Sequence, residues 1–125
     1  MKARVPHWAL ERVKGLVAEG KVWVQITRAL QFFETRGSAY DTARATIASL
    51  TQRAFAHSTA QTQDVCDVYG VVVDGGWYLK ICIDETVPEV AVISFHPLER
   101  PLRTNGGEVK PKGWQAPGPA SRRGR

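Results

Sequence analysis

The fold class is decided by residues 65–83, which read VCDVYGVVVDGGWYLKICI. Two apolar runs flank the turn Asp74-Gly75-Gly76, and such a turn suits a hairpin because its residues tolerate positive φ. In the second run, Trp77–Ile83, apolar residues recur at every other position, which is the period of a β-strand. The stretch therefore predicts two strands, and so short a connection makes them antiparallel.

The same period of two extends to both sides of this hairpin. A turn over Asp84–Pro88 leads to another expected strand, Glu89–His96. On the N-terminal side a weaker pattern near Arg53–Ser58 indicates an additional strand, and an isolated one is expected over residues 21–26. Short connections again favour antiparallel neighbours, so the second half of the chain is expected to form a meander.

The first half of the chain has the helical period of 3.6 instead. One helix is predicted over Trp8–Glu19, a second after Thr27 and ending at Gly37, and a third opening at Ser38 or Asp41. Their apolar faces contain Leu10, Val13, Leu16 and Val17; Ala29, Leu30, Phe32 and Phe33; and Tyr40, Ala43, Ile47 and Leu50. Helices followed by a meander predict an α+β fold, with about three helices on one face of a mostly antiparallel sheet of four or five strands.

The chain has 125 residues and a net charge of +5, but the charge is unevenly placed. Residues 1–96 contain ten Lys/Arg and ten Asp/Glu, whereas the last 29 residues contain seven Lys/Arg and two Asp/Glu. We expect one domain over residues 1–103 and a flexible, basic Pro/Gly-rich tail over 104–125. Any affinity of the body for RNA must therefore come from a local patch.

No segment suggests a membrane or a secreted protein. No apolar run approaches the length of a bilayer span, and the N-terminus lacks the apolar region of a signal peptide, so we expect a cytoplasmic protein. The two cysteines, Cys66 and Cys82, do not form a zinc pattern, and a reducing compartment disfavours a disulfide. We expect buried thiols, no metal and no cofactor.

Strand alternation collects polar groups on one face of the predicted sheet. If Leu79 and Phe95 face the helices, the opposite face receives Tyr78, Lys80, Ser94 and His96. A phenol, an ammonium, a hydroxyl and an imidazole suit RNA cleavage, which needs a base for the 2′-hydroxyl and groups that stabilise charge on the phosphate. The alternative is an ordinary solvated sheet face, and the pattern alone does not decide between them.

Several ordered segments resemble the motility quorum-sensing regulator (MqsR) family of RelE-like mRNA interferases. They are the opening Lys2–His7 with the helix that follows, then Asp67-Val68-Tyr69, Trp77-Tyr78-Leu79-Lys80-Ile81 and Val92-Ile93-Ser94-Phe95. Each motif is short, but together they cover about residues 2–96 in the family's order. The resemblance implies a RelE-like fold and a toxin of a type II toxin–antitoxin system. It also implies metal-independent, sequence-selective cleavage of single-stranded mRNA, and a cognate antitoxin with a helix-turn-helix DNA-binding domain.

The resemblance also assigns site residues, with departures from the family pattern. Tyr78 matches the family's tyrosine, His96 stands where the family has a lysine after Ser-Phe, and His57 falls at or near its other lysine. Cys66 occupies the glutamine position. We therefore expect His57 and His96 to be an acid–base pair, in either order, with Tyr78 on the phosphate.

Three further residues, Lys80, Arg100 and Arg103, are expected to bind the RNA backbone. We expect His7 to fix the start of the first helix. Two alternatives stay open at this point. One is a catalytically silent RNA-binding or regulatory module on the same fold, and the other is a protein-interaction domain without RNA contact.

Overall fold

A five-stranded mixed sheet lies at the centre of the computed structural model, which describes residues 3–25, 31–61 and 64–115. Its strands are β1 (Val22–Val24), β2 (Phe55–Gln61), β3 (Asp64–Val72), β4 (Gly76–Asp84) and β5 (Glu89–Pro97). Their order across the sheet is β1-β5-β4-β3-β2. Only β1 runs parallel to its neighbour β5, and the other pairs are antiparallel, which confirms the predicted meander.

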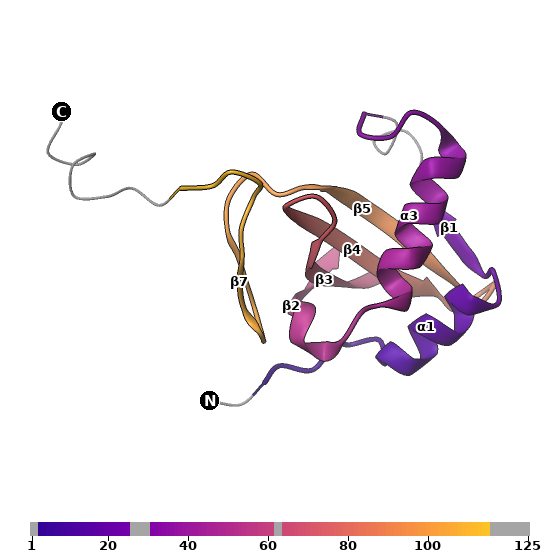
Figure 1. The fold of residues 1–125 in the computed structure, drawn as a ribbon. Helices are drawn as coiled ribbons and strands as arrows, with labels where there is room; N and C mark the ends of the chain where they lie inside the picture. The colour runs from indigo at the N-terminus through magenta and orange to yellow at the C-terminus, as the bar shows by residue number, and fades with distance from the viewer. Residues whose placement is uncertain (1–2, 26–30, 62–63, 116–125) are drawn as a thin grey trace, which may run out of the picture.

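Two α-helices, α1 (Leu10–Ala18) and α3 (Arg36–Ala48), cover one face of this sheet, and the 3-10 turn η1 (Gln52–Ala54) leads into β2 (Figure 1). The predicted stripe of the first helix is confirmed, because Val13 and Val17 are buried and Leu10 and Leu16 pack against the core. On α3 the small residues Ala39 and Ala43 are fully buried together with Ile47, so the helix lies close to the strands. The core side of the sheet contributes Phe55, Tyr69, Val71, Trp77, Leu79, Ile81, Ile83, Val90, Val92 and Phe95.

The prediction of a second helix ending at Gly37 is wrong where it can be compared. Residues 31–35 form turns and bends, and the rest of that helix falls on residues 26–30, outside the described part. Gly37 instead lies in the first turn of α3, which begins earlier than the expected Ser38 or Asp41. The cause is Thr35, whose hydroxyl accepts a hydrogen bond from the Ser38 backbone N–H at 3.0 Å and so caps the helix.

Order also continues beyond Thr104, where we expected a flexible tail. Strands β6 (Leu102–Thr104) and β7 (Gly107–Val109) form an antiparallel hairpin. Figure 1 shows it on the side of the sheet away from the two helices. Its docking site is made by glycines: a Cβ on Gly70 of β3 would lie 3.0–3.2 Å from the side chains of Thr104, Leu102 and Val109. The ordered body therefore extends past residue 103.

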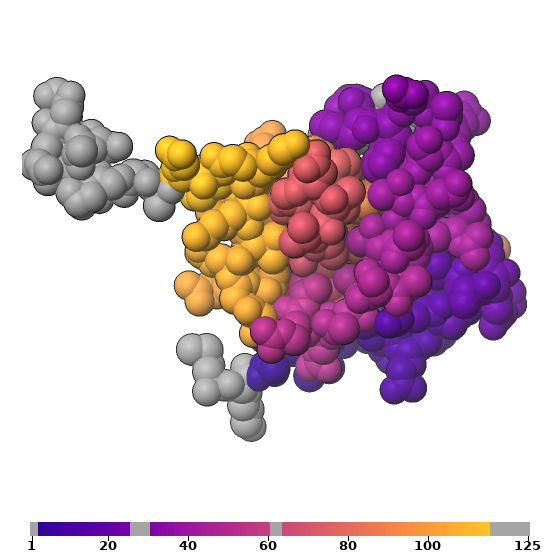
Figure 2. Space-filling view, in the orientation of Figure 1, coloured from indigo at the N-terminus to yellow at the C-terminus, as the bar shows by residue number. Residues whose placement is uncertain are grey.

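The hairpin is also bonded to distant segments of the chain. Asn105 accepts a hydrogen bond from the Arg4 backbone N–H, and its side-chain amide donates to the carbonyls of Arg4 and Gln52. At its other end, the Gly76 backbone N–H donates to the Lys110 carbonyl at 2.8 Å. Figure 2 shows the C-terminal segment packed directly against the residues around the β3–β4 turn.

Candidate functional site

Tyr78 and His96 form the centre of the polar group on the open face of the sheet, the face opposite the helices. They are directly opposed in the register of β4 and β5, as the alternation predicted. Their rings are stacked, with centroids 5.0 Å apart and planes inclined by 11°. Both side chains are half-buried, so they are held in place and remain accessible. A phenol and an imidazole thus share one small patch of surface.

The hydrogen bonding of His96 determines which of its nitrogens can do chemistry. Nδ1 lies 2.9 Å from the carbonyl oxygen of Pro97. Because a carbonyl only accepts, Nδ1 carries the proton and donates it, so neutral His96 has an unprotonated Nε2. That form is a general base. His96 also lines a pocket of about 170 Å³ together with Gln31, Phe32 and Glu99.

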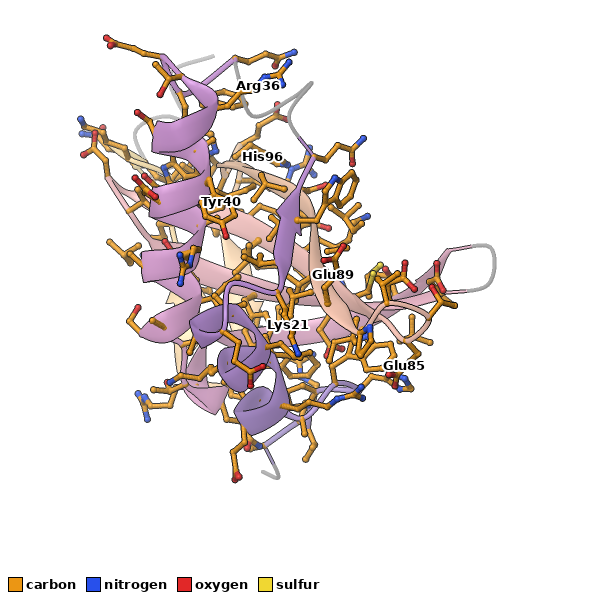
Figure 3. All side chains as sticks on the ribbon, turned by 90° about the vertical axis from the view of Figure 1, so that its right-hand side faces the viewer. Lys21, Arg36, Tyr40, Glu85, Glu89 and His96 are labelled. Carbon is orange, nitrogen blue, oxygen red and sulfur yellow. The ribbon has the colours of Figure 1, made fainter. Side chains whose placement is uncertain are left out.

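His96 stands at the end of the sheet nearest the start of α3, as Figure 3 shows with its labels for His96 and Arg36. The Phe32 ring lies 6.4 Å from the imidazole and 6.0 Å from the Trp77 ring, so the loop before α3 packs against this end of the sheet. Aromatic side chains therefore border the site on the side of the helices.

Tyr78 is kept in its protonated form by its surroundings. Burial raises the pKa of its phenol, and the neighbouring Cys66 raises that pKa further. At neutral pH the hydroxyl is therefore a hydrogen-bond donor, which suits a contact with a phosphate oxygen.

Lys80 lies one row along the same face, opposite Ser94 on β5. Only 9% of Lys80 is exposed, although we expected this residue to contact the RNA backbone. Its charge is therefore shielded from water, and a charge with little surrounding water acts over a longer range.

His57 is not brought to this group. The register runs from His57 through Val68 on β3 to Lys80 on β4, so two strands separate it from β5. At about 4.8 Å between neighbouring strands, His57 and His96 are roughly 14 Å apart across the sheet. In RNA cleavage the base acts on the 2′-oxygen and the acid on the 5′-oxygen, and both oxygens bond to the same phosphorus atom. The expected His57–His96 pair is therefore incompatible with this register.

The two arginines expected to bind backbone also differ in position. Arg100 is exposed in the segment that joins β5 to β6. Arg103 lies opposite Glu108 within the hairpin, and its neighbours Leu102 and Thr104 face the sheet. Because successive residues of a strand point to opposite sides, Arg103 points away from the site.

Residues 5–97 match the family model described as "Motility quorum-sensing regulator, toxin of MqsA". The chain belongs to the MqsR toxin family. No significant match is found among curated proteins. Membership in the MqsR family means that the chain is of the toxin type of a toxin–antitoxin system, with an antitoxin as its partner.

Within the MqsR match, the motif Asp67-Val68-Tyr69 has a structural role that the sequence did not reveal. The Asp67 carboxylate is fully buried and accepts hydrogen bonds from the backbone N–H groups of His7 at 3.1 Å and Trp8 at 2.8 Å. The Ser58 hydroxyl donates to it as well, at 2.6 Å. Asp67 therefore fixes the chain just before α1, and its bond to the His7 backbone agrees with the role expected for His7. An acidic residue within the apolar run Val65–Tyr69 was the signal that could have indicated this.

The MqsR match also contains both cysteines, and the expected buried thiols are confirmed. Cys66 and Cys82 are free and buried, and they form a small apolar cluster with Ala91. Burial is the main cause that raises the pKa of Cys82 to about 12, so this thiol is unreactive at neutral pH. The described residues contain no group of three or more His, Cys, Asp or Glu that could hold a metal ion. In the same part of the chain, no helix is long and apolar enough to cross a membrane.

Proposed function

We propose that this MqsR-family toxin is a metal-independent, sequence-selective endoribonuclease that cleaves single-stranded mRNA in the cytoplasm. The observation that supports it is the Tyr78–His96 stack, in which a base and a proton donor lie side by side on an open sheet face. Lys80, with its positive charge, stands one row along the same face. These are the functions that RNA cleavage by side chains requires.

In the proposed reaction, Nε2 of His96 takes the proton of a ribose 2′-hydroxyl. The 2′-oxygen then bonds to the adjacent phosphorus while the bond from phosphorus to the 5′-oxygen breaks. A 2′,3′-cyclic phosphate forms, and the departing 5′-oxygen takes a proton from water. The Tyr78 hydroxyl donates a hydrogen bond to the phosphate, whose negative charge grows in the transition state.

The test uses two histidines on the same face as a matched pair. Purified protein is incubated with mixed-sequence RNA, and the fragments are examined for 2′,3′-cyclic phosphate ends. We expect His96→Ala to lower the cleavage rate by about 10²–10⁴ and Tyr78→Phe by about 10². His57→Ala is expected to leave the rate unchanged. Equal losses in both histidine variants, or no loss in His96→Ala, would contradict the assignment.

A silent RNA-binding module is the second candidate, and one observation favours it. Because His57 lies three strands away from β5, a single histidine remains at the site. In this case RNA would be bound but recovered intact by wild-type protein. RNA that is neither bound nor cut would point to a protein-interaction domain instead.

The cellular role has a separate test. We propose that the cognate antitoxin has a helix-turn-helix DNA-binding domain and neutralises this chain in a complex. Expression of the chain alone should arrest bacterial growth, and co-expression of the product of an adjacent gene should relieve the arrest. Growth arrest by the His96→Ala variant would show that toxicity does not depend on cleavage at this site.

A further inference from the structure

The part of the chain beyond the family match contains the positive charge that the matched region lacks. Within the β6–β7 hairpin itself, Arg103 and Glu108 balance each other. Residues 5–97 have eight Lys/Arg and ten Asp/Glu, so this region is slightly acidic. Residues 98–125 have seven Lys/Arg and two Asp/Glu. A polyanion such as RNA is held mainly by contacts to its phosphates, so an acidic region needs cations from elsewhere.

Docking of the hairpin places the two segments that flank it, which contain Arg100 and Lys110, at the open face beside the proposed site. Gly70, which the hairpin covers, is the register partner of Tyr78. Two residues before Tyr78, Gly76 donates its backbone N–H to the Lys110 carbonyl and accepts a hydrogen bond from the Leu98 N–H at 3.0 Å. The segment that leaves β5 and the segment that leaves β7 therefore both lie at the Gly76 end of β4, one on each side.

Only some of the cations in this segment are available for a ligand. Lys112 is bound to Asp74 at 2.9 Å, and Arg103 stands opposite Glu108 on the outer side of the hairpin. Arg100 and Lys110 are exposed and form no salt bridge with the described residues. They belong to the two segments that meet Gly76, next to Tyr78 and His96.

We propose that Arg100 and Lys110 form a phosphate clamp that holds single-stranded RNA across the Tyr78–His96 stack. The segments that flank the β6–β7 hairpin are then substrate-binding elements, and the docking glycines of the hairpin position them. This inference rests on the proposed ribonuclease function. In this proposal Arg100 and Lys110 bind the nucleotides next to the cleaved bond, and His96 alone transfers the proton.

The experiment compares two double variants that remove the same charge from the hairpin and the segments that flank it. Arg100→Gln/Lys110→Gln removes the proposed clamp, and Arg103→Gln/Lys112→Gln is the matched control. Binding of a fluorescein-labelled, single-stranded 2′-O-methyl RNA is measured by anisotropy over about 50–200 mM salt. This RNA cannot be cleaved because it lacks the attacking hydroxyl. Rates on ordinary RNA are measured alongside.

We expect the clamp variant to bind about tenfold more weakly and to lose about 1.4 from the slope of log K against log salt, since each single-strand phosphate contact contributes about 0.7. Its KM should rise while kcat is retained. The control should keep the slope and bind within about twofold of the wild type. Equal loss in both variants, or in neither, would overturn the clamp.

The two proposals fail separately. If wild-type protein cleaves RNA and the clamp variant keeps its affinity and salt slope, the clamp is wrong and the ribonuclease stands. If wild-type protein binds the RNA without cleaving ordinary RNA, and only the clamp variant loses affinity, the clamp stands and the ribonuclease is wrong. Absence of any RNA binding by wild-type protein would overturn the clamp.

Discussion

Replacing Asp67 by alanine tests whether one buried carboxylate connects the sheet to the first helix. The side chain is fully buried and accepts three hydrogen bonds, from His7, Trp8 and Ser58. Asp67→Ala leaves these donors without their acceptor. Trp8 is half-buried, so water replaces the carboxylate poorly there, whereas His7 and Ser58 are more exposed and recover part of the loss.

The magnitude follows from these three bonds. A hydrogen bond to a charged group contributes about 1.5–3 kcal/mol, and partial recovery by water at two of the donors brings the sum to about 3–5 kcal/mol. Asp67→Asn keeps one acceptor oxygen but sets an NH₂ group against an N–H donor, so we expect an intermediate loss of about 2 kcal/mol. These losses are large beside a typical total stability of about 5–15 kcal/mol.

Urea unfolding followed by tryptophan fluorescence measures these losses, because Trp8 is itself one of the donors. The control is Asp64→Ala, at the exposed start of the same strand, which should change the free energy of unfolding by less than about 0.5 kcal/mol. If Asp67→Ala unfolds within about 1 kcal/mol of Asp64→Ala, the carboxylate does not hold this junction.

Three further predictions concern the hairpin, a buried phenol and the thiols. Gly76→Ala places a Cβ 2.3 Å from the Lys110 carbonyl oxygen and should lower the free energy of unfolding in urea by about 1–3 kcal/mol. Gly15→Ala, in open space within α1, should leave that free energy unchanged or raise it by up to about 1 kcal/mol. Equal effects of the two substitutions would contradict the docking role of Gly76. No described residue gives the buried Tyr69 hydroxyl a hydrogen-bond partner, and burial raises its pKa above the ordinary value of 10.0. The neutral phenol is thus favoured in the folded state, so wild-type stability should fall as pH rises above about 10. Tyr69→Phe should reduce that fall when melting temperature is followed against pH, and the raised pKa values of Tyr78 and Cys82 account for the remainder. Cys82, with its pKa raised to about 12, and the buried Cys66 should react with a thiol reagent at pH 8 only after unfolding; rapid reaction of the native protein would show that the cluster opens.

The strands and the pairing at the site could be predicted because both depend on local patterns. Alternation along β4 and β5 placed Tyr78 and His96 on one face, and the short turn between the strands brought them opposite each other. The position of His57 relative to His96 could not be predicted from local patterns, because it depends on the order of four strands. Strand order is a property of the whole sheet that no single segment encodes.

The ordered hairpin was missed for a related reason. The composition of residues 97–125, rich in proline and glycine, indicates a segment that buries little apolar surface by itself. Its stability comes from Gly70 and Gly76, which lie far away in sequence and allow close approach of the backbone and of Val109. Glycines in a strand signal such an approach, but they do not tell which segment approaches.

The bond between Asn105 and Arg4 spans 101 residues, and β1 pairs with β5 across 68 residues of chain. During synthesis, Arg4 and β1 therefore lack these partners until residues 90–105 have left the ribosome. Closing such distant contacts is slow compared with forming helices and hairpins. The five-stranded sheet is therefore completed late, and this delay gives an antitoxin that is already present time to bind.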